Sequence, residues 1–599
     1  MADLNIFKLL PTGDDTFAEV INKNKYYVDK TSYLKKVFAE DGSSVLLFTR
    51  PRRFGKTLLM DMFSDFFRLN VNNPSDTSFQ QKLFNGMEIM NDRAFVDKYM
   101  GQFPVISISL KGVIGGDFDI AKGALITLVK NLARTYSFLQ KSEVLTDDDK
   151  FDLKNLCSDS YLKKPINQNN LTDSLSFLSS CLFKHFKKQV IILIDEYDVP
   201  LANAANGKYH KQMVDLISSF LGVLKSTPKN TNEETSTILK VVMTGCLKVA
   251  KNSIFTGVNN VVVNTVLSTR SEFTTIIGFN KEETKKFLKD YNLSEYESMV
   301  KENYDGYRFD DVEMFCPWDV INFVAENYKH VLNHQEYKIK PDNYWNATSS
   351  SLLLQEYIGF LKEDIRQHLQ DLVDRKTIEV SINDSMNYDD LKLHDPDDFF
   401  SLLVHTGYLT AVGNPSKNNY IVKIPNEEIL NCFESNIKKV FDDNLTLGPD
   451  KKAEKLASGF LEGNTSSVTN ILNSLLTSYV SIRDLATKSK PENFYHGFMS
   501  GIFTVSEKWV KEYKSNFEAG NGYADISFRN SDKTKVAILE LKSSPSEKDM
   551  KIVAQKALLQ IEEKQYAKEF LELPTVQSIE AYGIAFFNKQ SFIISKKIM

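Results

Sequence analysis

One stretch near the amino terminus decides the fold: VLLFTRPRRFGKTLLMDMFSDFF, residues 45–67. Its first part, Val45–Thr49, is a short apolar run of the kind that forms a buried strand. Its last part, Lys56–Phe67, has apolar residues at helical spacing and predicts a helix. A glycine-containing loop joins the two. A strand, a loop and a helix that begins with Lys and Thr are the setting of a phosphate-binding loop.

The chemistry expected of this loop follows from the start of its helix. Backbone N–H groups at a helix N-terminus bind phosphate oxygens, and the helix dipole helps them. Lys56 would reach the β- and γ-phosphates of a nucleotide, and the Thr57 hydroxyl would bind Mg²⁺. The first glycine of the general pattern GxxxxGK[ST] is replaced by Arg50. The match is therefore incomplete, and a surface turn with the sequence Gly-Lys-Thr is the alternative.

A second acidic element favours the nucleotide site over that alternative. Val190–Asp195 is a continuous apolar strand that ends in an acid. Asp195 would hold the shell of the Mg²⁺ ion, and Glu196 could polarise the attacking water. Thr244 ends the next predicted strand, where it could sense the γ-phosphate. Taken singly, the Gly-Lys-Thr loop or the acid-tipped strand could each be a coincidence. Both occur here in strand context and in the correct order, which favours a nucleotide site.

The first third of the chain predicts an α/β fold. Apolar strands alternate with helical patterns, and continuous apolar strands indicate a parallel sheet buried between helices. The further strands expected are Val105–Leu110 and Leu239–Cys246, and the further helices are Phe118–Phe138, Leu171–Lys187 and His210–Leu224. A hairpin is expected later in the chain, with strands Gly407–Val412 and Tyr420–Ile424 around a turn at 413–416.

Composition excludes several classes of protein. The chain has 599 residues, of which 42% are hydrophobic and 25% charged, so disorder of the whole chain is excluded. A net charge of −5 argues against a protein that coats nucleic acid non-specifically. The five scattered cysteines indicate neither a disulfide framework nor a zinc site. With no signal peptide and no membrane-spanning run, we expect an intracellular, cytoplasmic protein without a membrane partner, the nucleus being the alternative.

Arginine is rare and locally concentrated. The 73 basic residues comprise 12 Arg and 61 Lys, and three of the arginines, Arg50, Arg52 and Arg53, fall within four residues. The lysine excess is explained by genome composition, but the cluster is not. Arginine offers a rigid bidentate fork for phosphate or carboxylate that lysine lacks.

The carboxy-terminal region predicts a second α/β pattern with its own site. Strands are expected near 512–518 and at Tyr523–Arg529, Val536–Leu541 and Ala581–Phe587, with a helix at 548–569. Asp525 lies in the second of these strands, and Glu540 and Lys542 share one face of the third. Two carboxylates suit Mg²⁺ or Mn²⁺, and the lysine can orient a water molecule. By itself this D…ExK spacing is frequent by chance.

Several further motifs make the chain recognisable. It resembles the AAA-ATPase-like family that carries a C-terminal PD-(D/E)XK nuclease domain, and the resemblance spans nearly the whole chain. The matching stretches are YYVDKT (26–31), TRPRRFGKT (49–57), LIDEYD (193–198), TG (244–245), FTGVNN (255–260), YDGY (304–307), PW (317–318), YW (344–345), GYL (407–409) and IPNEE (424–428). The family writes its loop as RPRRFGKT, so Arg50 is a family feature.

The resemblance implies a domain plan. Residues 1–280 would form a P-loop ATPase core of the additional-strand type, with the Walker B strand inserted in the sheet. Residues 281–430 would form a helical and mixed lid or connecting region, residues 431–490 a helical linker region, and residues 491–599 a restriction-endonuclease-like nuclease domain.

The resemblance also assigns site residues. In the ATPase, Arg52, Arg53, Phe54, Gly55, Lys56, Thr57, Asp195 and Thr244 would hold ATP, with Glu196 catalytic and Thr57 and Asp195 on the metal. Arg52 and Arg53 would pair with phosphate or with an acid near the loop. Arg270 could act as a trans finger in an oligomer, although a surface role is favoured, and Trp318 is expected to be a packing aromatic.

In the nuclease, Asp525, Glu540, Lys542 and the helical Gln560 would be catalytic, and Glu518, Asp525 and Glu540 would hold the metal. The first acid of the fold is Glu518 or Glu507, and Glu518 is favoured. Tyr523 stands where the family commonly has Arg, which removes one phosphate contact.

Two functions are consistent with these features. In the first, ATP binding and hydrolysis control a Mg²⁺-dependent nuclease that acts on DNA, with RNA as the alternative substrate. In the second, the chain is a non-cleaving, nucleotide-dependent switch or scaffold that binds nucleic acid or protein partners. The family context suggests a homo-oligomer and a role in defence, mobile elements or DNA processing.

Overall fold

The computed structural model describes residues 7–14, 16–38, 44–206, 209–224, 236–248, 261–268, 271–345, 368–369, 371–383, 396–416, 418–433, 449–479, 491–504 and 510–599. The chain divides into two compact units, Met1–Ile437 and Lys438–Met599. Each unit is described by itself.

The first unit is built on a parallel sheet of five strands in the order β2-β3-β4-β1-β5. The strands are β1 (Val45–Thr49), β2 (Val105–Ser109), β3 (Val190–Asp195), β4 (Ile238–Gly245) and β5 (Val261–Asn264). Every residue of β1 and β3 is buried, as a sheet covered on both faces requires. The predicted α/β class is thus confirmed. Because β4 lies between β1 and β3, the carboxyl ends of these three strands meet at one edge, where ligands bind in open α/β sheets.

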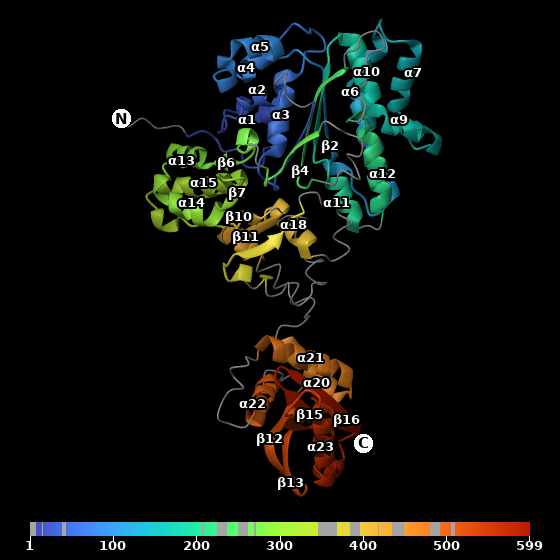
Figure 1. Cartoon of the computed structure of the whole chain (residues 1–599), viewed down its shortest axis with the longest axis vertical. Helices are drawn as coiled ribbons and strands as arrows, with labels where there is room; N and C mark the ends of the chain where they lie inside the picture. Colours follow the sequence, from blue (N-terminus) through green and yellow to red (C-terminus); the bar gives the residue numbers. More distant parts are fainter. Residues whose placement is uncertain are drawn as a thin grey trace. The chain divides into compact units, whose positions relative to one another are not determined.

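Helices cover both faces of this sheet. Figure 1 shows α3 with the other early helices on one side and α6, α7, α9, α10 and α12 on the other. The early helices are α1 (Phe17–Asn22), α2 (Tyr33–Val37), α3 (Lys56–Phe67), α4 (Ser78–Leu83) and α5 (Arg93–Tyr99). The later helices are α6 (Phe118–Thr135), α7 (Asp147–Leu156), α8 (Asp159–Leu162), α9 (Gln168–Thr172), α10 (Ser174–Phe186), α11 (Val199–Asn206) and α12 (His210–Phe220).

Helix α3 has the predicted bounds, whereas two predicted helices are shorter or divided. The helix expected over 118–138 ends at Thr135, because Thr, Tyr and Ser follow one another there and form helices weakly. The helix expected over 171–187 is two helices, α9 and α10. The second stops at Lys187, whose φ of 55° is left-handed.

A small antiparallel sheet follows, in the order β6-β8-β7. It comprises β6 (Phe279–Asn280), β7 (Tyr307–Phe309) and β8 (Val312–Phe315), with helices α13 (Lys281–Asp290), α14 (Glu297–Tyr304) and α15 (Pro317–Leu332). Its core also takes in side chains of the amino-terminal segment, among them Tyr26 and Val28. This packing brings residues of the amino-terminal segment and of the region 276–321 beside the phosphate-binding loop.

A third sheet, in the order β10-β11-β9, contains the predicted hairpin. It consists of β9 (Ile378–Ser381), β10 (Thr410–Ser416) and β11 (Asn419–Lys423), with helix α18 (Pro396–Thr406) beside it. The turn expected at 413–416 is wrong by a few residues. β10 continues through Gly413 and Pro415 by way of two register irregularities, and the chain reverses after Ser416.

The second unit is a mixed sheet of five strands in the order β12-β13-β14-β15-β16. The strands are β12 (Lys511–Ala519), β13 (Gly522–Arg529), β14 (Lys535–Ser543), β15 (Ser578–Phe587) and β16 (Gln590–Lys597), of which the last was not predicted. Only β14 and β15 run parallel among these neighbours. The helices are α20 (Pro449–Leu461), α21 (Thr465–Tyr479), α22 (Pro491–Thr504), α23 (Met550–Glu563) and α24 (Lys568–Leu571).

Three hydrophobic clusters of described residues pack on this sheet. Residues of α20, α21 and α22 form one core with Ile526, Leu539 and Ile584. Helix α23 packs closely against β15, where a Cβ at Gly583 would lie 2.1 Å from the Ala554 carbonyl oxygen. Only glycine permits that approach. The helices α20 and α21, which fall in the segment 431–490 expected to be a linker, therefore share a core with the nuclease-like sheet.

Candidate functional site

The loop after β1 bends sharply before it enters α3. Gly55 immediately precedes the helix with a φ of 97°, a conformation that favours glycine. Arg53 also has a positive φ, 67°. The loop thus presents the start of α3, with its unpaired N–H groups, to the carboxyl edge of the sheet.

Lys56 is buried beneath the loop. Its Nζ donates to the carbonyl oxygens of Arg50 and Pro51, each at 3.0 Å, and lies 3.7 Å from the Cys246 Sγ. Its side chain therefore has a defined position, with the ammonium group held at the loop by two neutral acceptors.

Three predicted residues form one hydrogen-bonded chain. The Thr57 hydroxyl donates to one carboxylate oxygen of Asp195 at 2.7 Å, and the Thr244 hydroxyl donates to the other. The three side chains come from α3, β3 and β4. A hydroxyl beside a carboxylate is a donor set that suits Mg²⁺, so these residues fit the expected ion.

Glu196 follows Asp195 in a strained backbone conformation, with a φ of 54°. Burial raises the pKa of its carboxyl group, and the Lys56 and Arg52 cations oppose that rise. A buried carboxyl group close to the loop lysine is suited to accept a proton from a water molecule.

Two carboxylates of the Asp195–Asp198 segment thus face the loop, and a third has another role. Asp198 accepts hydrogen bonds from the backbone N–H groups of Cys246 at 3.0 Å and Leu247 at 2.9 Å. Sequence reasoning gave Asp198 no role. It anchors the turn after β4 and so fixes the position of Thr244, and only its place in the LIDEYD stretch could have drawn attention to it.

The three clustered arginines have different surroundings. Arg50 is fully buried and donates to the carbonyl oxygens of Thr49 and Asn264 at 2.9 Å and to the Asn264 side chain at 2.6 Å. Burial lowers its pKa to about 9. It stabilises the loop from behind and is not positioned to bind phosphate.

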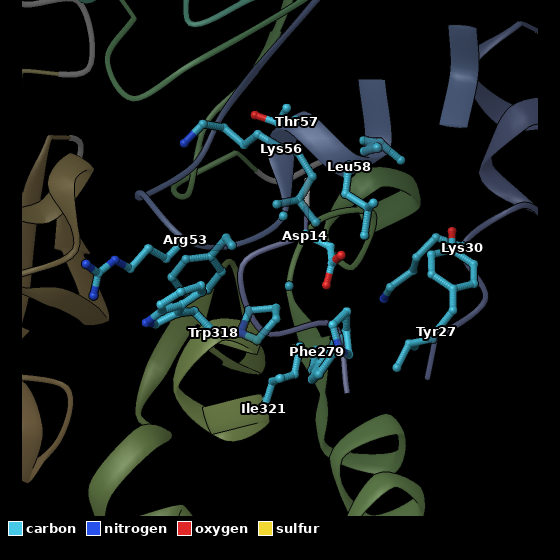
Figure 2. A pocket seen from close by; sticks show the side chains of 18 of the residues that line it. Asp14, Tyr27, Lys30, Arg53, Lys56, Thr57, Leu58, Phe279, Trp318 and Ile321 are labelled. Atoms are coloured by element: carbon cyan, nitrogen blue, oxygen red, sulfur yellow. The ribbon is translucent and has the colours of Figure 1, made fainter. Parts of the chain in front are cut away.

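Arg53 points toward the α15 side of the pocket. Its guanidinium lies 5.2 Å from the Trp318 ring and donates to the Tyr344 carbonyl oxygen. Figure 2 shows Arg53 and Trp318 at one side of the pocket and Lys30 and Tyr27 at the other. Arg52 is half-buried, and its positive charge acts to lower the pKa of Glu196.

A cavity of about 360 Å³ opens beside the loop. Its walls include Gly55–Leu59 and Glu196, together with apolar and aromatic residues from distant segments: Tyr27, Val28, Ile276, Phe279, Pro317, Trp318 and Ile321. An apolar wall next to a phosphate-binding loop suits a nucleoside. Trp318, expected to be a packing residue, is half-buried in this wall.

In the second unit, the sheet forks at Asp525. The β13–β14 ladder runs only from Ile526 to Arg529, whereas β13 stays paired with β12 back to Gly522. At the fork, one carboxylate oxygen of Asp525 accepts the Leu541 N–H at 2.7 Å. The fork brings Asp525 next to the segment that holds Glu540 and Lys542.

Of the two acids at this fork, Glu540 is buried and Asp525 is half-buried, and their charges are poorly neutralised. One Glu540 oxygen is 3.3 Å from the Lys542 Nζ, and the other has no hydrogen-bond partner among the residues that the structure describes. Burial, and next the Asp525 charge, raise the pKa of Glu540 to about 7, and burial also raises the pKa of Asp525. An unpartnered buried oxygen between two acids fits a bound cation.

The remaining predicted nuclease residues differ in how close the structure places them to the fork. Gln560 on α23 donates to the Tyr566 hydroxyl at 3.1 Å. The charges of Glu540 and Asp525 raise the pKa of Tyr566, and the charge of Lys542 lowers it. Glu518 is exposed on β12, opposite Tyr523. Glu507 lies outside the described residues, as do Arg270 and the stretch 255–260.

Sequence reasoning missed two residues of α22 near the fork. Glu492 accepts the Ser543 N–H at 3.3 Å, and its charge contributes to the raised pKa of Asp525. His496, one helical turn later, has its Nε2 3.1 Å from the Asp525 carbonyl oxygen. The signal in the sequence was Glu492 itself, an acid at the start of a predicted helix that directly precedes the strands of the nuclease site.

Two searches of the described residues gave negative results. No group of three or more His, Cys, Asp and Glu side chains is arranged there to hold a metal ion. An ion at the fork would therefore rely on two side-chain carboxylates, with water and backbone oxygens completing its shell, as is common for Mg²⁺. No helix in the described ranges is both long enough and apolar enough to cross a bilayer.

Comparison with known proteins gives two family matches and two weaker similarities. Residues 11–255 match the family model described as predicted AAA-ATPase, and residues 490–596 match the PD-(D/E)XK nuclease superfamily. An uncharacterized protein in the vnfD 5′ region of Azotobacter chroococcum mcd 1 is 23% identical over 353 residues, 59% of this chain and 56% of that protein. The chain thus matches little more than half the length of this relative.

A solved structure, that of the Aeropyrum pernix ORC2 protein in ADPNP-ADP complexes, aligns with 70% of this chain and 93% of its own. Its sequence identity is 9% and its TM-score 0.25, a value too low to support a fold assignment. The two family matches coincide with the two sites described above. The chain therefore carries an AAA-ATPase-like domain followed by a carboxy-terminal domain of the PD-(D/E)XK nuclease superfamily.

Proposed function

We propose that this protein binds and hydrolyses ATP and that its nucleotide state controls a Mg²⁺-dependent nuclease that acts on DNA. The observation that carries the proposal is the presence of two separate polar constellations with the right chemistry. One is Lys56, Thr57, Asp195, Glu196 and Thr244 at the sheet edge of the first unit. The other is Asp525, Glu540 and Lys542 at the fork of the second.

In the nucleotide site, Lys56 would exchange its two carbonyl acceptors for phosphate oxygens. Thr57 and Asp195 would hold Mg²⁺, which neutralises phosphate charge when bound. Glu196 would take a proton from the attacking water, and Thr244 would keep Asp195 oriented. The apolar cavity wall with Trp318 and Phe279 would enclose the nucleoside.

In the nuclease site, Asp525 and Glu540 would hold the metal ion through their oxygens, and Mn²⁺ could replace Mg²⁺. The ion lowers the pKa of a bound water and stabilises charge on the phosphate when it is present. Lys542, next to Glu540, would orient the water. Gln560, fixed by Tyr566, would position the substrate backbone.

A continuous set of contacts supports control by the nucleotide. Arg53 of the phosphate-binding loop donates to the Tyr344 carbonyl oxygen, and Trp318 Nε1 donates to the same oxygen at 3.3 Å. The N–H groups of Tyr344 and Trp345 both donate to one oxygen of Glu428. The 344–345 backbone is thus held between the loop and the segment that ends the described part of the first unit at residue 433.

Glu428 is itself in an unusual setting. It lies beside Asp319, and both carboxyl groups are buried. Burial raises the pKa of both groups well above their ordinary values, and Arg53 partly opposes the rise at Asp319. A movement of Arg53 toward a phosphate would remove a nearby positive charge and release the Tyr344 carbonyl. Both changes would loosen this segment.

The experiment is a cleavage assay of the purified protein on single- and double-stranded DNA and RNA, with and without ATP, in Mg²⁺ and in Mn²⁺. We expect metal-dependent cleavage of DNA that ATP alters, that Asp525→Ala abolishes and that Lys56→Ala makes insensitive to ATP. Arg53→Ala should still bind ATP but should lose most of the ATP effect. Tight ATP binding with no cleavage of any substrate would favour the non-cleaving switch instead.

A further inference from the structure

An aromatic side chain is displayed next to the nuclease acids without any structural partner. Tyr523 is 67% exposed, the highest exposure of any large apolar or aromatic side chain described in the second unit. No ring packs against it and no side chain bonds its hydroxyl among the residues that the structure describes. A core or packing role is therefore excluded for Tyr523.

The position of Tyr523 relative to the fork is set by regular strand pairing. The β12–β13 register is continuous from Lys514 opposite Ser527 to Ala519 opposite Gly522. Side chains alternate along such a strand, so Tyr523 and Asp525 lie on the same side of the β12–β13 ribbon. Their Cα atoms are two residues apart, about 7 Å in a strand. A phosphate bound at Asp525 would bring a neighbouring base within reach of the ring.

The hairpin that carries Tyr523 is anchored. Gly520 has a φ of 54°, and a Cβ there would lie 2.2 Å from the Lys564 carbonyl oxygen. The Asn521 N–H donates to that same oxygen at 2.8 Å. The hairpin tip is thus pressed onto the end of α23, and the ring is presented from a fixed backbone.

The charge directly across the hairpin from Tyr523 favours a base over a phosphate at the ring itself, while the Lys564 side chain lies beside the neighbouring Gly522. The residue opposite Tyr523 in the register is Glu518, whose exposed carboxylate would repel a phosphate. A phenol ring beside an acid offers a stacking surface and a hydrogen-bonding edge. In a duplex the faces of internal bases are covered by their neighbours, so a ring can stack only on an unpaired, flipped or terminal base.

We propose that Tyr523 is a base-stacking residue of the nuclease site and that the substrate is single-stranded DNA or an unpaired end. The inference rests on the proposed nuclease function and specifies its substrate class. Stacking on an aromatic side chain tolerates any base, so the preference would be for strandedness and not for sequence.

The test compares binding of a labelled single-stranded oligonucleotide and of a labelled, covalently closed duplex minicircle of the same sequence, which has neither ends nor loops, by fluorescence anisotropy of the full chain in Ca²⁺. Alanine substitution of one stacking residue weakens binding by roughly 10-fold or more. We expect that loss for Tyr523→Ala on the single strand and little change on the closed duplex. Tyr523→Phe should bind like the wild type. Tyr337→Ala, which removes an 82% exposed tyrosine of the first unit, is the matched control.

Three results would overturn the inference. Tyr523→Ala could bind the single strand as tightly as the wild type, or lose affinity equally for both substrates. It could also keep both affinities and lose self-association by light scattering, which would make the ring a protein contact. If the wild-type chain binds neither substrate and cleaves none, the nuclease proposal itself fails. A folded Tyr523→Ala protein is verified by an unchanged melting temperature.

Discussion

The nucleotide site and the nuclease site differ in how their polar groups are satisfied. In the first, Lys56, Thr57 and Thr244 all have hydrogen-bond partners inside the protein, and Asp195 accepts on both oxygens. In the second, a half-buried Asp525 stands beside a buried Glu540, and one Glu540 oxygen has no hydrogen-bond partner in the described part of the chain. The first site is organised before a ligand arrives. The second carries a charge conflict that a cation would resolve.

This difference separates what each ligand must do. A nucleotide would exchange existing hydrogen bonds for new ones, and it would stabilise the folded first unit by mass action alone. A metal ion would remove repulsion between two carboxyl groups and would therefore stabilise the second unit as it binds. Substitutions at the two sites should consequently differ in how they change activity, ligand binding and stability.

The largest effect is expected from the fork. Glu540→Gln and Asp525→Asn should each reduce cleavage by ~10³-fold or more, because the metal ion contributes several kcal/mol to the transition state. The measurement is the initial rate on a labelled DNA substrate. Glu563→Gln, which changes an exposed acid of α23, is the matched control. Cleavage at the wild-type rate by Glu540→Gln would show that the fork is not the nuclease site.

At the nucleotide site, two variants should divide binding from chemistry. Lys56→Ala should abolish ATP binding, whereas Glu196→Gln should bind ATP normally and hydrolyse it ~10²- to 10³-fold more slowly. Calorimetry measures the first and phosphate release the second. Lys82→Ala, an exposed lysine of α4, should match the wild type in both assays. Unchanged ATP binding by Lys56→Ala would refute the phosphate-binding loop.

The charge conflict also predicts a pH dependence of stability in the metal-free protein. Folding raises the pKa of Glu540 from 4.5 to about 7, so the folded state binds more protons than the unfolded state between those values. The free energy of unfolding should therefore fall by about 2–3 kcal/mol as the pH rises through this window. Thermal melts in EDTA measure it.

Glu540→Gln should remove most of this loss, since the amide does not ionise. Mg²⁺ should restore stability to the wild type at pH 8 and not to the variant. An equally steep pH dependence in Glu540→Gln would assign the effect to other groups.

The smallest effect compares Glu492, which the structure brings near the fork, with Glu518, the first acid that the motif resemblance favours over Glu507. Glu492 accepts a backbone N–H near the fork, whereas Glu518 is exposed on the β12–β13 hairpin. Glu492→Gln should lower the cleavage rate by ~10-fold through the site's electrostatics, and Glu518→Gln should change it less than twofold. Equal losses would restore Glu518 to the metal site, as the motif resemblance suggested.

Patterns local in sequence were predicted well because they depend on local physics. Lys56–Phe67 could be read as a helix from its spacing, and β1 and β3 from their continuous apolar runs. Helix ends were less predictable. The division between α9 and α10 and the end of α6 depend on weak propensities that neighbouring packing decides.

Several site residues became evident only through contacts between distant segments. Arg50 and Arg53 are three residues apart and look alike in the motif, yet one is a buried loop support and the other contacts Trp318 and Tyr344. Which arginine faces phosphate depends on the backbone path of the loop and on what packs around it, and neither is encoded in spacing.

The sequence alone predicted that this chain joins a phosphate-binding loop and an acid-tipped strand to a later D…ExK pair. Each motif is weak by itself, but its chemistry requires given residue types, and the strand context and the family resemblance cover both. The tertiary structure decided which acids share a site, that Glu492 approaches Asp525 while Glu518 stays exposed, and that Tyr523 is exposed near them. The physical reason is that burial, the fork between strands and the packing of distant segments set the local charge balance. These features arise only when those segments meet in the folded chain.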